Sequence, residues 1–95
     1  MKVIWSPEAR EDLREIYSTL AVENPYAARA LHERIQEGVQ LLRDNPHIGR
    51  PGRVPGTREL VISGTLYIVP YQIREQRLEL LRVYHTARKW PERFH

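Results

Sequence analysis

The chain has 95 residues, of which 41% are hydrophobic and 28% charged, an ordinary globular composition. We expect one domain, residues 1–95, because this length is too short for an enzyme with a separate cofactor domain. The sequence contains no cysteine, which excludes disulfides, thiolate metal sites and a cysteine nucleophile. No apolar run approaches the roughly 20 residues of a membrane span, and the N-terminal apolar stretch is too short for a signal peptide. We therefore expect a cytoplasmic protein that makes no membrane contact.

The net charge of +3 is unevenly distributed along the chain. Residues 1–45 hold six basic and eight acidic side chains, whereas residues 46–95 hold nine basic and four acidic ones. Thirteen of the 15 basic residues are arginine, whose planar guanidinium suits phosphate and carboxylate groups. A high-GC genome would also favour arginine, but it would not explain the difference between the two halves. The basic C-terminal half therefore predicts an anionic partner.

The N-terminal half predicts a short strand followed by two helices. Residues 2–5 are predicted as the strand, and Ser6-Pro7 then begins a helix whose apolar residues recur at helical spacing. Asn24-Pro25 repeats the same start signal, and Pro46 ends the second helix near residue 44. Because the connection between the helices is so short, we expect them to form an antiparallel hairpin.

The C-terminal half changes to loop and strand signals. The stretch 45–57 is rich in proline and glycine and is predicted as a loop. Three strands are predicted after it, with turns at Ser63-Gly64 and Glu75-Gln76: 58–62, 65–74 and 77–84. Pro70 lies within the second of these strands and requires an edge, a bulge or a break there.

This order of elements predicts an α+β fold. The domain begins with an N-terminal strand, and its antiparallel helical hairpin packs on one face of a small antiparallel sheet. The other face of the sheet is predicted to be open. In the last strand, Arg82 and Tyr84 share one face and His85 lies on the other, so either Arg82 and Tyr84 or His85 would project onto the open face. Residues 86–95 are predicted to form a polar tail with Trp90 as an aromatic anchor.

Most catalytic classes are poorly supported by the residues. The four histidines show no metal-ligand spacing, so we expect no metal and no cofactor. Gly49-Arg50-Pro51-Gly52 does not make a phosphate loop, because its proline lacks the amide that such a loop needs. A serine nucleophile would need a strand–turn–helix elbow, which the pattern does not contain.

One set of side chains remains as a candidate site. Guanidinium groups can hold a phosphate and stabilise its transition state, and a histidine or tyrosine can move the proton in metal-free RNA cleavage. The candidate catalytic residues, if the chain is a nuclease, are Arg58, Arg82, Tyr84 and His85. The candidate binding residues are Arg50, Arg53, Arg88, Lys89 and Trp90.

Three of these candidates also have an ordinary structural interpretation. Arg82 would equally suit a strand arginine that pairs with Glu59 or Glu79. His85 would suit a hydrogen-bonded histidine at a strand end, and Trp90 a packing anchor. By themselves, the residues do not name a function.

Several segments resemble the RelE/ParE superfamily of toxins from type II toxin–antitoxin modules. The similarity lies in WSPEAREDLREIY, LLRDNPHIGRPGRVPGTREL, YIVPYQI and LELLRVYHTARKWP, which cover nearly the whole chain in order. This resemblance implies a growth-inhibiting, plasmid-stabilising type of toxin that is neutralised by a cognate antitoxin. It also implies that the toxin–antitoxin complex binds operator DNA through the antitoxin.

The resemblance leaves two targets open. ParE-like members are poisons of DNA gyrase and would do no bond chemistry, and the long helical hairpin favours this interpretation. RelE-like and YoeB-like members are ribosome-dependent mRNA endonucleases; the alternative is therefore a metal-independent endoribonuclease, in which Arg58 and Arg82 hold the phosphate and His85 or Tyr84 moves the proton. A third hypothesis, a small nucleic-acid-binding protein on the same scaffold, predicts no effect on growth.

Overall fold

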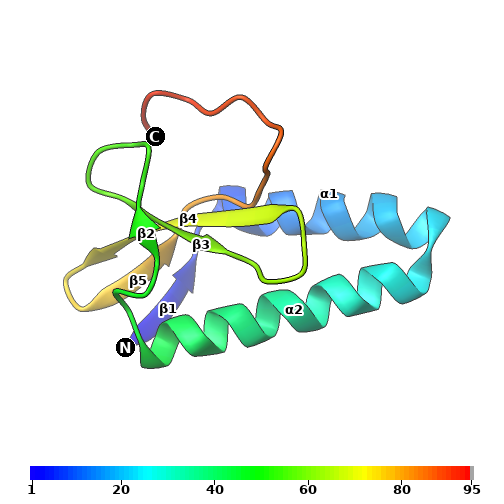
Figure 1. Ribbon diagram of the computed structural model, residues 1–95, viewed down its shortest axis with the longest axis horizontal. Helices are drawn as coiled ribbons and strands as arrows, with labels where there is room; N and C mark the ends of the chain where they lie inside the picture. Colours follow the sequence, from blue (N-terminus) through cyan, green and yellow to red (C-terminus); the bar gives the residue numbers. More distant parts are fainter. Residues whose placement is uncertain (95) are drawn as a thin grey trace.

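The computed structural model describes residues 1–94 and contains two helices and six strands (Figure 1). The elements, in chain order, are β1 (Lys2–Trp5), α1 (Pro7–Glu23), α2 (Pro25–Asp44), β2 (Arg50–Pro51), β3 (Arg58–Val61), β4 (Tyr67–Arg74), β5 (Arg77–Leu80) and β6 (Tyr84–His85). The strand order is β1-β5-β4-β3-β2, and β6 also pairs with β4. The predicted α+β fold is therefore confirmed, with His95 outside the described residues.

Both helices begin at the residues that the sequence predicts. The Ser6 Oγ accepts a hydrogen bond from the Ala9 backbone N–H at 3.0 Å, and the Asn24 Oδ1 accepts one from the Ala27 N–H at 3.1 Å. Each cap is followed by proline at the first helical position, where a missing N–H costs nothing. Asn24 ends α1 and begins α2, so the helices run antiparallel as a hairpin (Figure 1).

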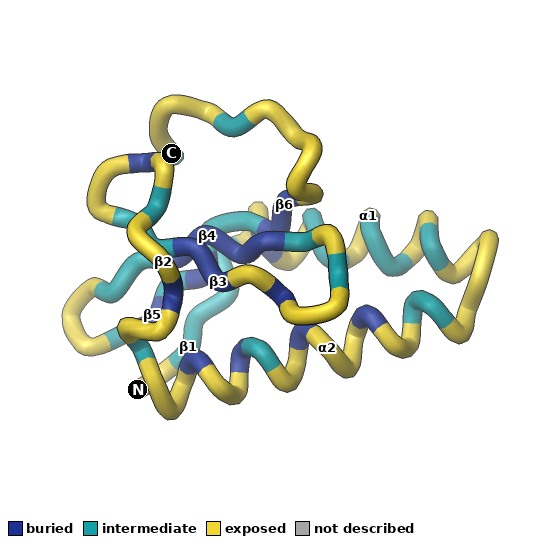
Figure 2. The backbone as a smooth tube through the Cα atoms, viewed as in Figure 1, coloured by how far each residue is buried: buried dark blue, intermediate teal, exposed yellow. Residues whose placement is uncertain are grey.

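The core lies between the helical hairpin and one face of the sheet (Figure 2). One side of α2 is buried at helical spacing, through Leu31, Ile35, Val39 and Leu42. Towards its tip the hairpin extends beyond the sheet (Figure 1), and there Val22 is 87% and Tyr26 84% exposed. Within the described part of the chain, neither helix is both long and apolar enough to span a bilayer.

Two details of the sheet differ from the prediction. The sheet is antiparallel except at its edge, where β1 pairs with β5 in parallel. The segment predicted wholly as a loop contains β2, whose Arg50 and Pro51 pair with Glu59 and Arg58 of β3. These pairings bring the stretch 45–57, which we call the basic loop because it carries Arg50 and Arg53, against the first residues of β3.

The single strand predicted over 77–84 is wrong, because pairing with β4 breaks after β5 and resumes at β6. Leu81 still donates its N–H to the Pro70 carbonyl at 2.9 Å, and the next pair is Ile68 with Tyr84. Two residues, Arg82 and Val83, therefore stand opposite one residue of β4, which is a β-bulge. The strand that contains Pro70 was expected to be an edge or to be bulged or broken there, but β4 continues through Pro70 as an inner strand, and the bulge lies in the neighbouring segment, opposite Val69.

The bulge decides which face of the sheet each following side chain occupies. Val83 is buried in the core cluster beneath the sheet, whereas Tyr84 pairs with Ile68 and is buried outside that cluster. Tyr84 therefore lies on the face away from the helices, which it shares with Pro70 and Glu59. His85, paired with Tyr67, lies on the helix face.

Candidate functional site

The sheet face away from the helices is only partly open, because the C-terminal segment 86–94 arches over it (Figure 1). Its Trp90 packs edge-on against Tyr84 at a ring-centroid distance of 5.2 Å, and Phe94 lies 6.1 Å from the same ring. Tyr84 is consequently 1% exposed. The expectation that Tyr84 projects from an open face is therefore corrected: it lies on that face, but the tail covers it.

Two guanidinium groups contact the ring of Tyr84. The Cζ of Arg82 lies 4.9 Å from the ring centroid and that of Arg88 4.4 Å from it. A third guanidinium, that of Arg53, lies 4.0 Å from the Trp90 centroid. We call Arg82, Tyr84, Arg88, Trp90 and Phe94 the Tyr84 cluster. Cation–π contacts of this kind hold the tail against the sheet.

Arg82 pairs with Asp12 of α1, and not with Glu59 or Glu79. Its Nε and Nη2 donate to the two Asp12 carboxylate oxygens at 2.8 and 2.9 Å. Asp12 also accepts the Val83 backbone N–H at 2.9 Å, so one carboxylate fastens both residues of the bulge to α1. The hydrogen bond to Asp12 is the main reason why the pKa of Arg82 is raised.

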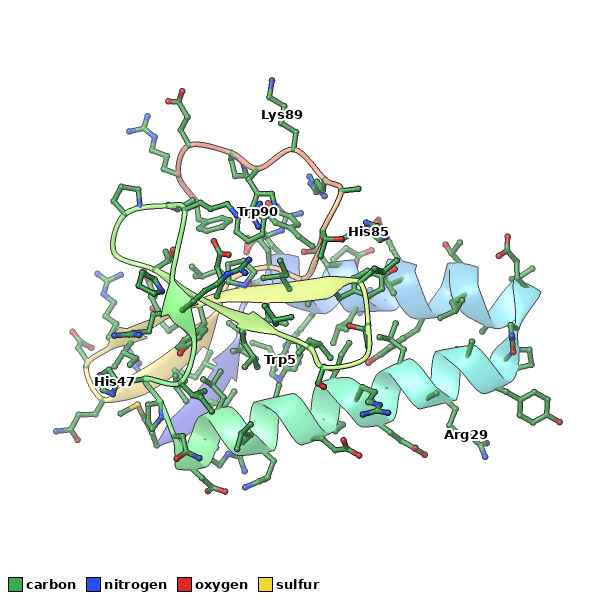
Figure 3. The ribbon with its side chains drawn as sticks, viewed as in Figure 1. Trp5, Arg29, His47, His85, Lys89 and Trp90 are labelled. Carbon is green, nitrogen blue, oxygen red and sulfur yellow. The ribbon has the colours of Figure 1, made fainter. Side chains whose placement is uncertain are left out.

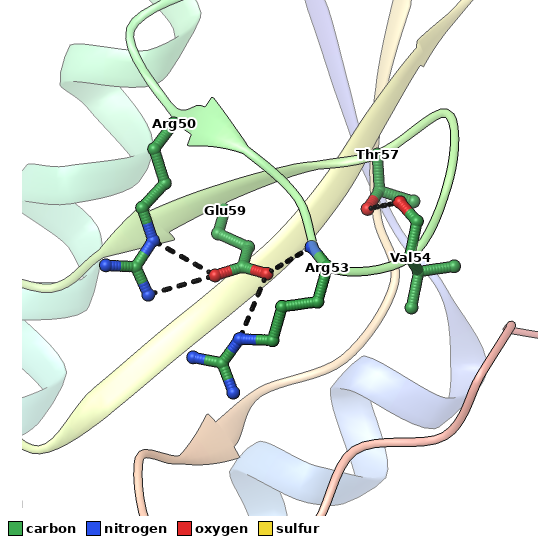
Figure 4. A network of polar contacts seen from close by, with 5 residues as sticks. All are labelled: Arg50, Arg53, Val54, Thr57 and Glu59. Atoms are coloured by element: carbon green, nitrogen blue, oxygen red, sulfur yellow. Dashed lines mark hydrogen bonds and ion pairs between the residues drawn. The ribbon is translucent and has the colours of Figure 1, made fainter.

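Glu59 organises the basic loop from beneath (Figure 4). Its side chain is 1% exposed and accepts hydrogen bonds from Nε and Nη2 of Arg50 at 3.1 and 3.0 Å. Its other oxygen accepts the Arg53 backbone N–H at 2.8 Å and lies 3.4 Å from the Arg53 Nε. A buried carboxylate needs such partners, so Arg50 and Arg53 are partly engaged in neutralising it.

Arg58 is held at the start of β3 by the loop after α2. Its Nη1 donates to the carbonyls of His47 and Gly49 at 3.1 and 2.8 Å. The neighbouring Tyr71 hydroxyl donates to the Pro46 carbonyl at 2.7 Å and accepts the Gly49 N–H at 3.0 Å. Burial is the main cause of the raised pKa of Tyr71. Arg58 and Tyr71 together fix the entrance of the basic loop.

His85 is exposed and lies at the opposite end of the sheet from His47 (Figure 3). Its Nδ1 accepts the Ala87 backbone N–H at 3.0 Å, and its ring packs edge-on against Tyr67 with centroids 5.5 Å apart. Lys89 is exposed on the tail and points away from the sheet (Figure 3).

The predicted site residues therefore fall into separate groups. Arg82 and Tyr84 lie together with two of the predicted binding residues, Arg88 and Trp90. Arg58 lies elsewhere. On β4, Arg58 pairs with Tyr71 and His85 pairs with Tyr67, so their positions are four residues apart along that strand, or about 13 Å at 3.3 Å per residue. Within residues 1–94 no group of three or more histidine, aspartate or glutamate side chains is arranged to hold a metal ion.

Sequence reasoning missed three residues that organise this site. They are Asp12, which bonds Arg82 across 70 positions, Tyr71, which bonds Pro46 across 25, and Glu59, which bonds Arg53 across only six. The only sequence signal for any of them is a carboxylate within a predicted strand, at Glu59, which would have to be neutralised when buried.

Comparisons with known proteins agree on the family. The family described as the ParE toxin of the type II toxin–antitoxin system parDE matches residues 3–90. A Sinorhizobium fredii protein named "Putative toxin Y4kP" is 37% identical over 91 residues, which are 96% of this chain and 94% of that protein.

Two solved structures share the fold. One is the chromosomal ParDE system from P. aeruginosa, with a TM-score of 0.80 and 30% identity, covering 90% of this chain and 95% of the other. The second is the RelBE2 toxin–antitoxin complex from Mycobacterium tuberculosis, with a TM-score of 0.62 and 26% identity, covering 88% and 95%. Because the ParE model matches nearly the whole chain, this protein belongs to the ParE toxin family of type II toxin–antitoxin systems.

Proposed function

We propose that this toxin, acting as one domain in the cytoplasm, inhibits DNA gyrase and is neutralised by an antitoxin encoded beside it. The observation that carries the proposal is the match of residues 3–90 to the ParE toxin family. The ParE-like toxins, which the sequence resembles, are poisons of DNA gyrase. The similar solved structures are toxin–antitoxin systems, which supports an antitoxin as partner. The complex of the two proteins is proposed to bind operator DNA through the antitoxin.

The arrangement of the candidate catalytic residues supports a toxin without bond chemistry. A nuclease needs its phosphate-holding and proton-transferring groups around one phosphate, within hydrogen-bond reach. The Arg58 guanidinium is instead bonded to two backbone carbonyls, about 13 Å along β4 from the position of His85. Arg82 is bonded to Asp12 through two nitrogen atoms.

The binding residues then have a different role, in recognising an anionic surface. Lys89 and Arg88 are exposed on the tail, and Arg50 and Arg53 present half-exposed guanidinium groups beside it. Trp90 fixes the tail against Tyr84. Together they form a basic surface on the side of the molecule away from α2, opposite in charge to the N-terminal half.

The alternative, a RelE/YoeB-like ribosome-dependent mRNA endonuclease, is favoured by one observation. The guanidinium carbons of Arg82 and Arg88 each lie within 5 Å of the centroid of the Tyr84 ring, in a chain that is also similar to the RelBE2 complex. In this alternative Arg82 holds the phosphate, and Tyr84 or His85 moves the proton. Arg58 would then have to leave its carbonyl partners to reach the same phosphate.

A gyrase cleavage assay tests the proposal. Purified toxin is incubated with gyrase, ATP and supercoiled plasmid, and the reaction is stopped with detergent and protease. We expect linear DNA that increases with toxin and disappears when the antitoxin is added. If toxin that still arrests cells gives no linear DNA, gyrase is not the target.

Two charge reversals make the assay specific for the proposed surface. Lys89→Glu changes an exposed residue of the basic tail, and Arg29→Glu makes the same charge change on the exposed side of α2 (Figure 3). We expect Lys89→Glu to reduce cleavage severalfold and Arg29→Glu to leave it unchanged. Equal effects of the two variants would mean that net charge matters and the tail does not.

Substitution of His85 separates the two targets. Because the His85 ring has only a local contact to the Ala87 N–H and an edge contact to Tyr67, His85→Gln should leave the fold intact. The gyrase proposal predicts unchanged toxicity, whereas the endonuclease alternative with His85 as acid or base predicts its loss. Toxicity is measured as growth arrest after induction, with expression and thermal melting of the variant as controls.

A further inference from the structure

A cavity of about 610 Å³ lies between the C-terminal segment, Tyr84 and the N-terminus of α1. A volume of this size is typical of sites for small molecules, which range over roughly 300–1,000 Å³. Its walls include the rings of Tyr84, Trp90 and Phe94, and more apolar than polar surface faces the inside. The gyrase proposal uses the exposed cations Arg88 and Lys89 that line this cavity, but it assigns no ligand to the space itself.

The charged residues around the cavity are mostly positive. Among residues 1–94, four cationic side chains and a single carboxylate line it, namely Arg82, Arg88, Lys89, Arg93 and Glu8. Only Arg82 has a carboxylate partner among residues 1–94, through Asp12. The cavity therefore attracts anions, and guanidinium groups are matched to phosphate in particular.

The aromatic residues add a second requirement on the ligand. The rings of Trp90 and Phe94 lie 6.4 Å apart at an interplanar angle of 60°, and both line the cavity together with Tyr84. The guanidinium of Arg53 lies over the Trp90 ring. A planar group such as a nucleobase suits a lining of aromatic rings and guanidinium groups.

We propose that the cavity binds a free nucleotide, with the base against the rings of Trp90 and Phe94 and the phosphates on Arg88 and Arg93. An ordinary anion would use only the guanidinium groups, and an apolar molecule would use only the rings. The inference goes beyond the proposed function, because a free nucleotide is neither antitoxin nor gyrase and its binding is measured on the purified full chain alone.

Calorimetric titration with three probes tests the proposal. The probes are ADP, which carries both groups, and adenosine and pyrophosphate, which carry one each; no metal ion is added. We expect ADP to bind with one-to-one stoichiometry and at least about tenfold more tightly than either partial probe, because one charge-assisted contact alone is worth about tenfold. Equal binding of ADP and pyrophosphate would overturn the proposal and leave a general anion patch.

The geometry of the cavity predicts a different change in ADP affinity for each of three variants. Arg88→Ala removes an exposed cation of the cavity and should weaken ADP binding about tenfold. Glu8→Gln removes the one carboxylate that the described residues place in the cavity lining, and it should tighten ADP binding by about threefold, since a repulsive charge is lost. Arg29→Ala removes an equal charge from a distant exposed helix surface and should have no effect (Figure 3).

Some results with these variants, or with one further ligand, would overturn the proposal. If Arg29→Ala weakens ADP binding as much as Arg88→Ala does, the attraction is an unspecific effect of charge. If Glu8→Gln leaves the affinity for ADP unchanged or weaker, the anion binds outside this cavity. Binding of a short RNA oligonucleotide without binding of ADP would overturn the proposal, because the cavity would then be part of a nucleic-acid surface. Unfolding of any variant is checked by thermal melting before titration.

Discussion

Replacing Asp12 by asparagine should destabilise the fold more than any other single change of charge in the helices. The side chain of Asp12 is 11% exposed and that of Arg82 26% exposed, so both charges are largely withdrawn from water. Asp12 accepts three hydrogen bonds, two from the guanidinium and one from the Val83 N–H. An asparagine of the same shape keeps one acceptor oxygen and turns an N–H₂ group towards the remaining donors.

The expected loss follows from these contacts. Breaking a buried ion pair costs about 3–5 kcal/mol, and the partial exposure of Arg82 lowers this to about 2–3 kcal/mol. The matched control is Glu11→Gln, one residue earlier on α1, where Glu11 pairs with Arg14 at 3.0 Å on an exposed surface. An exposed pair at this spacing contributes only about 0.3–0.5 kcal/mol.

Urea unfolding followed by circular dichroism measures both variants. With a slope of about 1 kcal/mol per molar, typical of small proteins, Asp12→Asn should lower the midpoint by about 2–3 M and Glu11→Gln by less than about 0.5 M. Arg82→Met should cost a similar amount, and the double variant little more than either single one, because both remove the same interaction. A loss for Asp12→Asn no larger than that of Glu11→Gln would refute the reasoning.

Two further predictions follow from individual side chains. The Tyr17 hydroxyl is buried without a partner among residues 1–94, and burial raises its pKa to about 12; Tyr17→Phe should therefore stabilise the fold by about 1 kcal/mol in urea unfolding. The pKa of Tyr17 in the folded protein lies above the ordinary value of 10.0, so the stability linked to its protonated form is complete below pH 10 and is lost as the pH rises towards 12. The stability advantage of Tyr17→Phe should therefore grow over that interval. A Tyr17→Phe variant that is less stable than the original protein at pH 8 would disprove the idea. Gly49→Ala should cost about 2–3 kcal/mol in the same assay, because a Cβ there would lie 2.6 Å from the Tyr71 hydroxyl. Gly56→Ala should cost only about 1 kcal/mol of backbone strain, since the φ of Gly56 is 78° but nothing lies within 4 Å of a Cβ there. Equal losses of stability for the two variants would contradict this difference.

The parts of the fold that were predicted correctly depend on short-range signals. Ser6-Pro7 and Asn24-Pro25 mark the helix starts through contacts that span three residues. The turn at Glu75-Gln76, where both residues have positive φ, follows from the two flanking strands. Propensity and periodicity act over these distances, so a single sequence is sufficient to locate such elements.

The parts that were missed depend on pairing between distant residues. The break after β5 follows from the register of Pro70 with Leu81 and of Ile68 with Tyr84, which no local pattern of 77–84 contains. The same holds for Asp12, because nothing near it in sequence distinguishes it from the exposed Glu11. Strict alternation left open which residues of the last strand face away from the helices. It put Tyr84 on the same side as Leu78 and Leu80, which lie in the core, whereas the bulge moves Tyr84 to the other face, where the tail covers it.

The bulge at Arg82-Val83 connects the fold to the candidate site. In a regular strand Arg82 and Tyr84 would share the helix-facing side of the sheet with Leu78 and Leu80, which are buried in the core. The extra residue instead lets Arg82 reach Asp12 on α1 while Tyr84 turns beneath the tail, where Trp90 covers it. The positive surface that stays exposed is therefore carried by the tail and the basic loop, through Arg88, Lys89 and Arg53. Under the gyrase proposal, the toxin presents this charge for binding, and the residues best suited to chemistry hold the surface in place.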